Sequence, residues 1–348
     1  MGVYPELFQP LLTRNLSLKN RIVYPPMATR YDITTERARA YYAERARGGV
    51  GLVVVEGTSV DNFGKPAYVA AIRPLAEEVH AAGARIALQL SVPPRGLDGA
   101  VIAPSATEQA REATTEDIRA VHGKLATAAA GVKEAGFDAV EIHGAHGYFV
   151  SQFFSPRSNR RTDRYGGSRE RRMRFAVEAI GTVRAAVGPE YPLLFRLSAV
   201  EFRSDGVTLE DTEALVPELE RAGVDVLDVS AGSGGQQPSE TSPSATAPMA
   251  TFAAYAAALR RRVSIPVIAV GRINRPEVAQ DVLQRGQADL VAIGRQLLAD
   301  PLWPLKVAEG REAEIVACAS CNRGCLGSLE RGEPIRCERN PRAGQEYL

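Results

Sequence analysis

The amino-acid sequence lacks a long apolar run, an excess of charge of either sign and more than a few cysteines. None of its apolar runs approaches the ~20 residues that span a membrane. Lys and Arg (42) balance Asp and Glu (41), so the net charge is +1 and the basic excess typical of nucleic-acid-binding proteins is absent. The first residues, MGVYPELF, carry no basic stretch followed by an apolar core. We therefore expect no signal peptide and a cytoplasmic protein.

The composition is that of an ordinary soluble globular protein. Of the 348 residues, 45% are hydrophobic and 24% are charged, which excludes a disordered, collagen-like or coiled-coil chain. A chain of this length buries about three quarters of its unfolded surface, so it needs neither disulfides nor a metal to fold. The length suits one parallel α/β barrel as well as two smaller domains.

Eight short apolar runs rich in β-branched residues recur along the chain, with helical segments such as 115–135 and 168–187 between them. The runs cover residues 21–27, 51–57, 84–90, 139–144, 193–198, 224–230, 266–271 and 289–295. Continuous apolar runs are typical of parallel strands covered on both faces. We therefore predict an α/β fold of the (β/α)₈ TIM-barrel type; an open doubly wound sheet is the alternative, although no strand is followed by a complete GxGxxG turn. Residues 232–248, rich in Ser, Gly and Pro, are expected to form a long, mobile loop over the barrel mouth.

Polar side chains follow several predicted strands, at the end where barrel enzymes carry their active sites. Gln89 ends the third strand, His143 ends the fourth, and Arg196 lies on the fifth. The last two strands each end in a glycine–arginine pair, Gly271–Arg272 and Gly294–Arg295. Open backbone amides beside a guanidinium suit a phosphate group, so these two pairs predict a phosphate site.

All four cysteines lie near the end of the chain, at Cys318, Cys321, Cys325 and Cys337. A reducing compartment disfavours disulfides and makes the group a candidate metal site. The first three cysteines would share one face if their segment were helical. Four thiolates bind Zn²⁺ or an iron–sulfur cluster, and only the first pair has the CxxC spacing that zinc ribbons use twice.

Several longer motifs resemble the flavin-dependent Old Yellow Enzyme family. They are residues 20–27 (NRIVYPPM), 141–148 (EIHGAHGY) and 159–167 (NRRTDRYGG), and the last-strand Gly294-Arg295 followed by Asp300-Pro301. The resemblance spans essentially the whole chain and implies FMN across the barrel mouth, with NAD(P)H as an electron donor. It also implies an ene-reductase-like oxidoreductase, which moves hydride between flavin N5 and an α,β-unsaturated carbonyl compound in reduction or in the reverse desaturation.

The same resemblance implies roles for individual residues. Tyr148 is expected to supply a proton to the substrate α-carbon. His143 and His146 are expected to donate hydrogen bonds to the substrate carbonyl, as an oxyanion hole does. From the residues alone, the two histidines also fit a pair of satisfied polar side chains or two ligands of a metal. The residues expected to contact FMN are Pro26, Met27, Ala28 and Gly57 around the ring system, Gln89 and Arg196 at its polar edge, and Gly271, Arg272, Gly294 and Arg295 at the phosphate.

The cysteine spacing, with Asn340-Pro341 after the last cysteine, resembles the [4Fe–4S] site of the family branch that contains 2,4-dienoyl-CoA reductase and trimethylamine dehydrogenase. This implies an FMN-binding barrel over residues 1–310 and a [4Fe–4S]-binding segment over residues 311–348, without that branch's C-terminal FAD or NAD(P) domain. The alternative function is an amine-dehydrogenase-like or electron-transfer flavoprotein whose cluster passes electrons to a partner protein. A non-enzymatic barrel with zinc as a structural clip is a further alternative. The partners expected are a small-molecule substrate, a separate electron-transfer or reductase protein and further copies of the chain, with no nucleic acid and no membrane.

Overall fold

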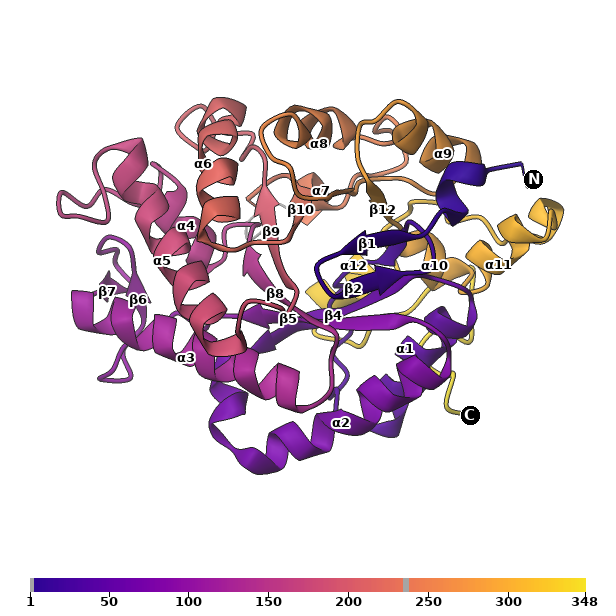
Figure 1. Ribbon diagram of the computed structural model, residues 1–348, viewed down its shortest axis with the longest axis horizontal. Coiled ribbons are helices and arrows are strands. Elements are labelled where there is room, and N and C mark those ends of the chain that lie inside the picture. Colours follow the sequence, from indigo (N-terminus) through magenta and orange to yellow (C-terminus); the bar gives the residue numbers. More distant parts are fainter. Residues whose placement is uncertain (1–2, 234–237) are drawn as a thin grey trace.

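The computed structural model describes residues 3–233 and 238–348 and contains a closed barrel of eight parallel strands (Figure 1). The strands follow one another around the barrel in chain order, and the last of them pairs with the first. They are β3 (Ile22–Tyr24), β4 (Leu52–Ser59), β5 (Arg85–Ser91), β8 (Ala139–Gly144), β9 (Leu193–Ser198), β10 (Val226–Ser230), β11 (Val267–Ala269) and β12 (Leu290–Ala292). Each apolar run noted in the sequence overlaps one of these strands, and the predicted barrel is confirmed.

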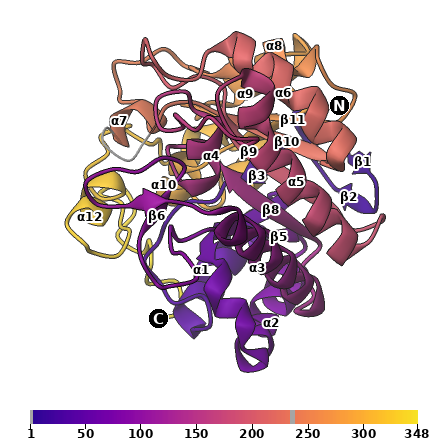
Figure 2. The same cartoon turned by 90° about the vertical axis from the view of Figure 1, so that its left-hand side faces the viewer.

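Helices cover the outside of the barrel (Figure 2). The longer ones are α1 (Glu36–Arg47), α2 (Pro66–Ala81), α3 (Thr115–Glu134), α5 (Arg169–Val187), α6 (Leu209–Ala222), α8 (Ala253–Arg260) and α9 (Pro276–Gln284). The shorter ones are α4 (Phe149–Phe154), α7 (Pro238–Thr241), α10 (Arg295–Ala299), α11 (Trp303–Ala308), α12 (Leu326–Glu330) and the 3₁₀ turns Pro5–Phe8, Val60–Gly64 and Glu312–Glu314. Within the part of the chain that the structure describes, no helix combines the length and apolar character needed to cross a membrane.

Capping side chains determine where two of the long helices begin. Thr114 precedes α3, and its hydroxyl accepts the backbone N–H of Asp117, whose carboxylate in turn accepts the N–H of Thr114. Thr208 and Asp211 form the same reciprocal pair at the start of α6. Each of these reciprocal pairs, called a capping box, provides acceptors for backbone N–H groups that the first turn of a helix leaves without partners. The predicted start of the helix near residue 115 therefore has a local cause in the sequence.

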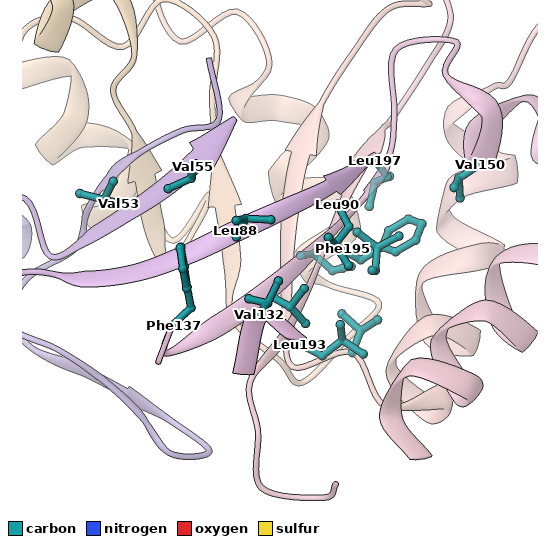
Figure 3. Packing of buried hydrophobic residues seen from close by; sticks show 14 of the residues in the cluster. Val53, Val55, Leu88, Leu90, Val132, Phe137, Val150, Leu193, Phe195 and Leu197 are labelled. Atoms are coloured by element: carbon teal, nitrogen blue, oxygen red, sulfur yellow. The ribbon is translucent and has the colours of Figure 1, made fainter. Parts of the chain in front are cut away.

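Successive side chains of a strand point to opposite faces. The apolar residues therefore divide into two cores, one inside the barrel and one between the strands and the surrounding helices. Leu52 and Val54 belong to the cluster inside the barrel. Val53 and Val55 belong to the larger cluster between the strands and the helices (Figure 3). The hairpin of β1 (Leu11–Thr13) and β2 (Leu16–Leu18) contributes Leu11, Leu16 and Leu18 to the inner cluster, whereas Leu12 is exposed. Arg85, at the start of β5, donates to the carbonyl of Ser17 in this hairpin. The hairpin thus closes the barrel at the amino ends of the strands and leaves the carboxyl ends open.

Two local predictions are corrected by the structure. The segment 232–248 is not a continuous loop, because α7 lies within it; residues 234–237 of that segment lie outside the described residues. The cysteines do not share a helical face. Ser320 and Asn322, on either side of Cys321, both have left-handed backbone angles (φ of 51° and 58°), which no helix accommodates, and α12 begins only after Cys325.

Gly144, the last residue of β8, has no room for a side chain. A Cβ atom there would lie 2.2 Å from Cζ of the buried Phe195 ring on the neighbouring strand. We expect Gly144→Ala to lower the free energy of unfolding by ~1–3 kcal/mol, the usual cost of overpacking a core. Urea unfolding monitored by circular dichroism measures this. Gly181→Ala, at an open position of helix α5, is the matched control and is expected to raise stability slightly. Equal stability of the two variants would contradict the packing argument.

Candidate active site

A cavity of about 330 Å³ opens at the carboxyl ends of the barrel strands. Residues from β4, β5, β8 and β9 and from the loops after β3, β11 and β12 line it, which is the position expected for a barrel active site. The structure brings into its walls every residue that the sequence assigned to flavin or substrate: Pro26, Met27, Ala28, Gly57, Gln89, His143, His146, Tyr148, Arg196, Gly271, Arg272, Gly294 and Arg295.

The floor of the cavity is a layer of polar side chains on adjacent strands. Gln89 on β5 and Arg196 on β9 line the cavity, whereas Glu141 on β8 and Asp228 on β10 are wholly buried beneath them. Gln89 Nε2 donates to Glu141 Oε1 (2.8 Å), and Arg196 Nη1 lies 3.3 Å from Asp228 Oδ2. Among the described residues, Arg196 Nε and Nη1 find no hydrogen-bond acceptor. A buried guanidinium in this state is suited to a polar ligand in the cavity.

The two carboxyl groups of this layer were not predicted as site residues, although the sequence contains a signal for them. Glu141 and Asp228 interrupt apolar runs that form strands buried on both faces, where a carboxyl group is costly without a partner. Burial, followed by the negative charge of Asp228, raises the pKa of Glu141 to about 8. Burial also raises the pKa of Asp228, and the nearby Arg196 opposes that rise.

His143 and His146 lie side by side above the floor, with ring centroids 5.3 Å apart. The backbone N–H of Ala145 donates to His143 Nδ1 (3.2 Å), so the neutral ring carries its proton on Nε2. His146 Nε2 lies 2.7 Å from the hydroxyl oxygen of Ser230. Burial and then the positive charge of Arg196 lower the pKa of His143 to about 3 and hold that of His146 well below its usual value. Both rings are therefore neutral near pH 7.

Tyr148 follows the histidines at the rim of the cavity. Its ring centroid is 4.7 Å from that of His143 in an edge-to-face arrangement, and the residue is 53% exposed. Its phenol therefore stands between the histidine pair and solvent. A hydroxyl in this position can exchange a proton with water and with a ligand bound over His143.

The other end of the cavity contains the two predicted glycine–arginine pairs. Gly294 precedes α10, and a Cβ there would approach Met27 Sδ to 2.8 Å and Pro25 Cγ to 3.2 Å, so a side chain would require these neighbours to move. Arg272 donates through Nη1 to the carbonyl of Ala247 and leaves its buried Nε without an acceptor among the described residues. Arg295 donates to Asn322 Oδ1 (2.5 Å). The sequence did not single out Asn274, a further lining residue whose Oδ1 is likewise buried and unpartnered in the described part of the chain.

The cysteine-containing segment forms one wall of the same cavity, which the sequence did not predict. Ser320, Leu326, Leu329 and Ile335 line it together with Cys318 and Cys325. The segment is anchored to the barrel by hydrogen bonds from the Cys318 N–H to Gln296 Oε1 (2.9 Å), from the Ile335 N–H to the Thr29 carbonyl (3.0 Å) and from Asn340 Nδ2 to the Leu298 carbonyl (3.0 Å). No local sequence pattern reports such contacts, because their partners lie 22, 306 and 42 residues away along the chain.

The four cysteines are free thiols in one neighbourhood. The Arg336 N–H donates to the Gly324 carbonyl (2.8 Å), which brings the segments carrying Cys325 and Cys337 together. Burial raises the pKa of both of these thiols, and the charges of Cys318 and Cys321 add to that rise. Nevertheless, within residues 3–233 and 238–348 no three His, Cys, Asp or Glu side chains converge in a way that could hold a single metal ion.

The fold and cavity define a barrel protein whose site suits an anionic ligand, with polar groups at one edge and two glycine–arginine pairs at the last two strands. Residues 6–314 match the NADH:flavin oxidoreductase / NADH oxidase family. The chain belongs to this family of flavin oxidoreductases, as the sequence motifs predicted.

The relatives are of two lengths. The NADH oxidase of Thermoanaerobacter brockii is 42% identical, with 99% of this chain aligned to 57% of that protein. The NADPH dehydrogenase of a Geobacillus species is 37% identical, with 91% of this chain aligned to 98% of that protein. A solved structure of a 2-naphthoyl-CoA reductase complex superposes with a TM-score of 0.92 at 28% identity and covers 99% of this chain and 58% of that one. The chain thus spans little more than half of the longer relatives that match almost all of it.

Proposed function

We propose that the cavity binds FMN and that the protein transfers hydride between the flavin and a conjugated carbonyl compound. The Nε atoms of Arg196 and Arg272, which have no hydrogen-bond acceptor among the described residues, fit the negative edge of a flavin and its phosphate, and Gly294 permits close approach of the backbone to the latter. When bound, FMN supplies the hydride-accepting and hydride-donating centre, and NAD(P)H is the expected electron source.

The observation that carries this proposal is the pair of neutral histidines above the floor. Both rings lie in the cavity, and the Nε2–H of His143 is left as a donor by the hydrogen bond at Nδ1. Such a donor stabilises negative charge on a carbonyl oxygen, which makes the β-carbon of a conjugated substrate electrophilic. Tyr148 holds the proton for the α-carbon. The 2-naphthoyl-CoA named for the solved relative is itself a conjugated carbonyl compound.

We further propose that residues 311–348 bind a [4Fe–4S] cluster beside the barrel of residues 1–310. Support comes from the loop geometry around Cys321, from the pairing of the Cys325 and Cys337 segments, and from the Ser320 N–H, which donates to Cys318 Sγ (3.4 Å). Zinc requires four ligands at one point, which the thiols do not provide, whereas a four-iron cluster is larger and separates its ligands.

This segment favours a second candidate function. Cys318 and Cys325 line the cavity proposed for FMN, so a cluster held by them would lie next to the flavin and could relay single electrons. The second candidate is therefore an amine-dehydrogenase-like or electron-transfer flavoprotein, which passes electrons from substrate through the cluster to a separate partner protein. Both candidate functions use FMN and the iron–sulfur cluster. They differ in whether the electrons pass from the flavin to a small-molecule substrate or through the cluster to a partner protein.

Anaerobic half-reactions test the proposed function. The purified protein is expected to contain FMN, to be reduced by NADH or NADPH, and to be reoxidised by members of a panel of α,β-unsaturated aldehydes, ketones and thioesters. Reoxidation by one-electron acceptors alone, with reduction by amines, would favour the second candidate. A protein that binds no flavin would contradict both.

Arg196 is expected to contribute a charge-assisted hydrogen bond to FMN. Its loss in Arg196→Ala removes ~1.5–3 kcal/mol, so the dissociation constant for FMN is expected to rise by roughly 10- to 100-fold. Quenching of FMN fluorescence on titration with apoprotein measures the change. Arg196→Lys keeps the charge that compensates Asp228 but lacks the planar guanidinium. Its affinity for FMN is expected to lie between those of the wild type and Arg196→Ala. Unchanged affinity in Arg196→Ala would remove this residue from the flavin site.

A further inference from the structure

The polar layer beneath the cavity contains two carboxyl groups and one cation. Glu141 is 0% exposed, Asp228 is 1% exposed, and neither lines the cavity. Two charged groups act on Glu141, Asp228 from β10 and Arg196 from β9. The uncharged Gln89 from β5 donates to it, and the neutral His143 lies two residues further along β8. With both carboxyl groups ionised, the layer would hold an uncompensated negative charge away from water, which is strongly unfavourable.

Geometry decides which carboxyl group carries the proton that removes this charge. Asp228 has the guanidinium of Arg196 at 3.3 Å, which favours its ionised form. Glu141 has only the amide of Gln89, which donates to Oε1 and leaves Oε2 buried and without a hydrogen-bond partner among the described residues. Asp228 Oδ1 is buried without a hydrogen-bond partner as well, so the guanidinium beside Asp228 decides that the proton belongs on Glu141 Oε2. The elevated pKa of Glu141, about 8, agrees with this assignment.

We propose that Glu141 is a proton-binding positioning residue of the flavin site, which holds the one proton of the Glu141–Asp228 pair. This inference rests on the proposed FMN site. With this proton bound to Glu141, Arg196 faces one carboxylate instead of two. The positive charge of Arg196 therefore remains available to a ligand in the cavity. Glu141 also holds the Gln89 amide by Nε2, with Oε1 turned toward Gly57. Both flavin-edge contacts predicted from the sequence thus depend on a residue that does not touch the cavity.

The charge above Arg196 determines how tightly this proton is held. A hydride from NAD(P)H brings two electrons and one proton to the cavity and leaves one additional negative charge there, with NAD(P)⁺ as the product. That charge attracts protons to the pair below. At a pH where Glu141 is ionised before the hydride transfer, it takes up one proton from solvent during the transfer. The redox equilibrium then depends on pH more steeply, by the contribution of that one additional proton. Where Glu141 is already protonated, no such uptake occurs.

Glu141→Gln tests the proposal, because glutamine keeps the shape and cannot ionise. In the apoprotein, infrared difference spectra are expected to show a protonated carboxyl band that disappears as pH rises through about 8 and that is missing in Glu141→Gln. In the FMN-bound wild-type protein, the midpoint potential is expected to fall more steeply with pH above that value. The additional slope corresponds to the uptake of one more proton per two electrons. The variant is expected to lose this step. Glu201→Gln removes a buried carboxyl that accepts from Ser155 and Val207 elsewhere, and it is expected to retain both signals.

Asp228→Asn provides a second, independent measurement if Glu141→Gln does not fold. Without Asp228, Glu141 becomes the only carboxyl near Arg196, so its titration is expected to move to lower pH by a unit or more, a tenfold change in proton affinity. A step that persists in Glu141→Gln, or that stays in place in Asp228→Asn, would overturn the proposal. Because the apoprotein titration needs no cofactor, a normal titration without FMN binding would instead overturn the proposed flavin site.

Discussion

His143→Ala is expected to slow reduction of a conjugated carbonyl compound by ~10²–10³-fold, the usual effect of removing one oxyanion donor. The Ala145 N–H and the packing of the ring against His146 and Tyr148 fix the orientation of His143. Its Nε2–H can therefore donate to a ligand in the cavity without further reorganisation. His146→Ala is expected to have an effect of similar size. If the two rings donate to one substrate oxygen, as proposed, the double variant is expected to lose less than the product of the single losses.

Two measurements separate this role from a structural one. Reduction of the flavin by NAD(P)H, followed at its visible absorption band, is expected to remain near normal unless the nicotinamide uses the same donors. His80→Ala is the matched control, since His80 pairs with Asp138 at the opposite end of β8. Loss of both half-reactions in proportion to the folded fraction would show that the histidines merely support the fold.

The histidine donors also predict how the reaction depends on pH. The pKa of His143 is about 3, lowered by burial and by Arg196, so this ring is neutral at pH 5 and above. Stopped-flow rates of substrate reduction are therefore expected to show no inflection near pH 6.5, where an exposed histidine titrates. An inflection there that disappears in His143→Ala would contradict the neutral-donor assignment.

The barrel and most of its site were predictable from the sequence because their signals are local. Parallel strands covered on both faces produce continuous apolar runs, and polar residues in the second half of such a run can face the barrel mouth; this placed Gln89, His143 and Arg196 in one cavity. The strands β11 and β12 end before their glycine–arginine pairs, since these pairs turn away to line the cavity.

What the sequence did not predict depends on contacts between distant residues. Ile335 packs over the cavity because its N–H reaches the carbonyl of Thr29, at the other end of the chain. The helical arrangement imagined for the cysteines failed at Ser320 and Asn322, whose left-handed angles are imposed by the fold of the segment and not by residue type alone. Glu141 was overlooked although a carboxyl group within a buried strand is itself a signal of function.

If residues 311–348 hold the proposed iron–sulfur cluster, Cys321→Ser is expected to remove it altogether and to abolish electron transfer to one-electron acceptors. Among the four proposed ligands Cys321 is the one to change, because it is exposed and does not line the cavity, whereas Cys318 and Cys325 do. Its replacement therefore leaves the cavity walls in place. Iron and acid-labile sulfide are expected to fall from about four of each per chain to near zero, with FMN retained.

The same variant separates the two candidate functions, because each uses a different exit for the electrons. If the flavin donates hydride directly to substrate, dithionite-reduced Cys321→Ser is reoxidised by a conjugated carbonyl compound at close to the wild-type rate. If the cluster is the exit, turnover with ferricenium or another one-electron acceptor collapses in the variant while flavin reduction persists. Ser328→Ala, a buried change in the same segment that spares every thiol, controls for general loosening of the wall.

Three outcomes would count against the cluster as an electron relay. One zinc per chain in the wild-type protein, with no iron, would identify a structural clip. Loss of FMN together with iron in Cys321→Ser would show that the cluster holds the wall formed by Ser320, Leu326 and Ile335 in place and does no more. Unchanged one-electron turnover after complete loss of iron would show that electrons leave the flavin without the cluster. The proximity of Cys318 and Cys325 to the cavity makes the relay the expected result, because thiolates exposed to oxidation are a costly way to support a wall that apolar residues already form.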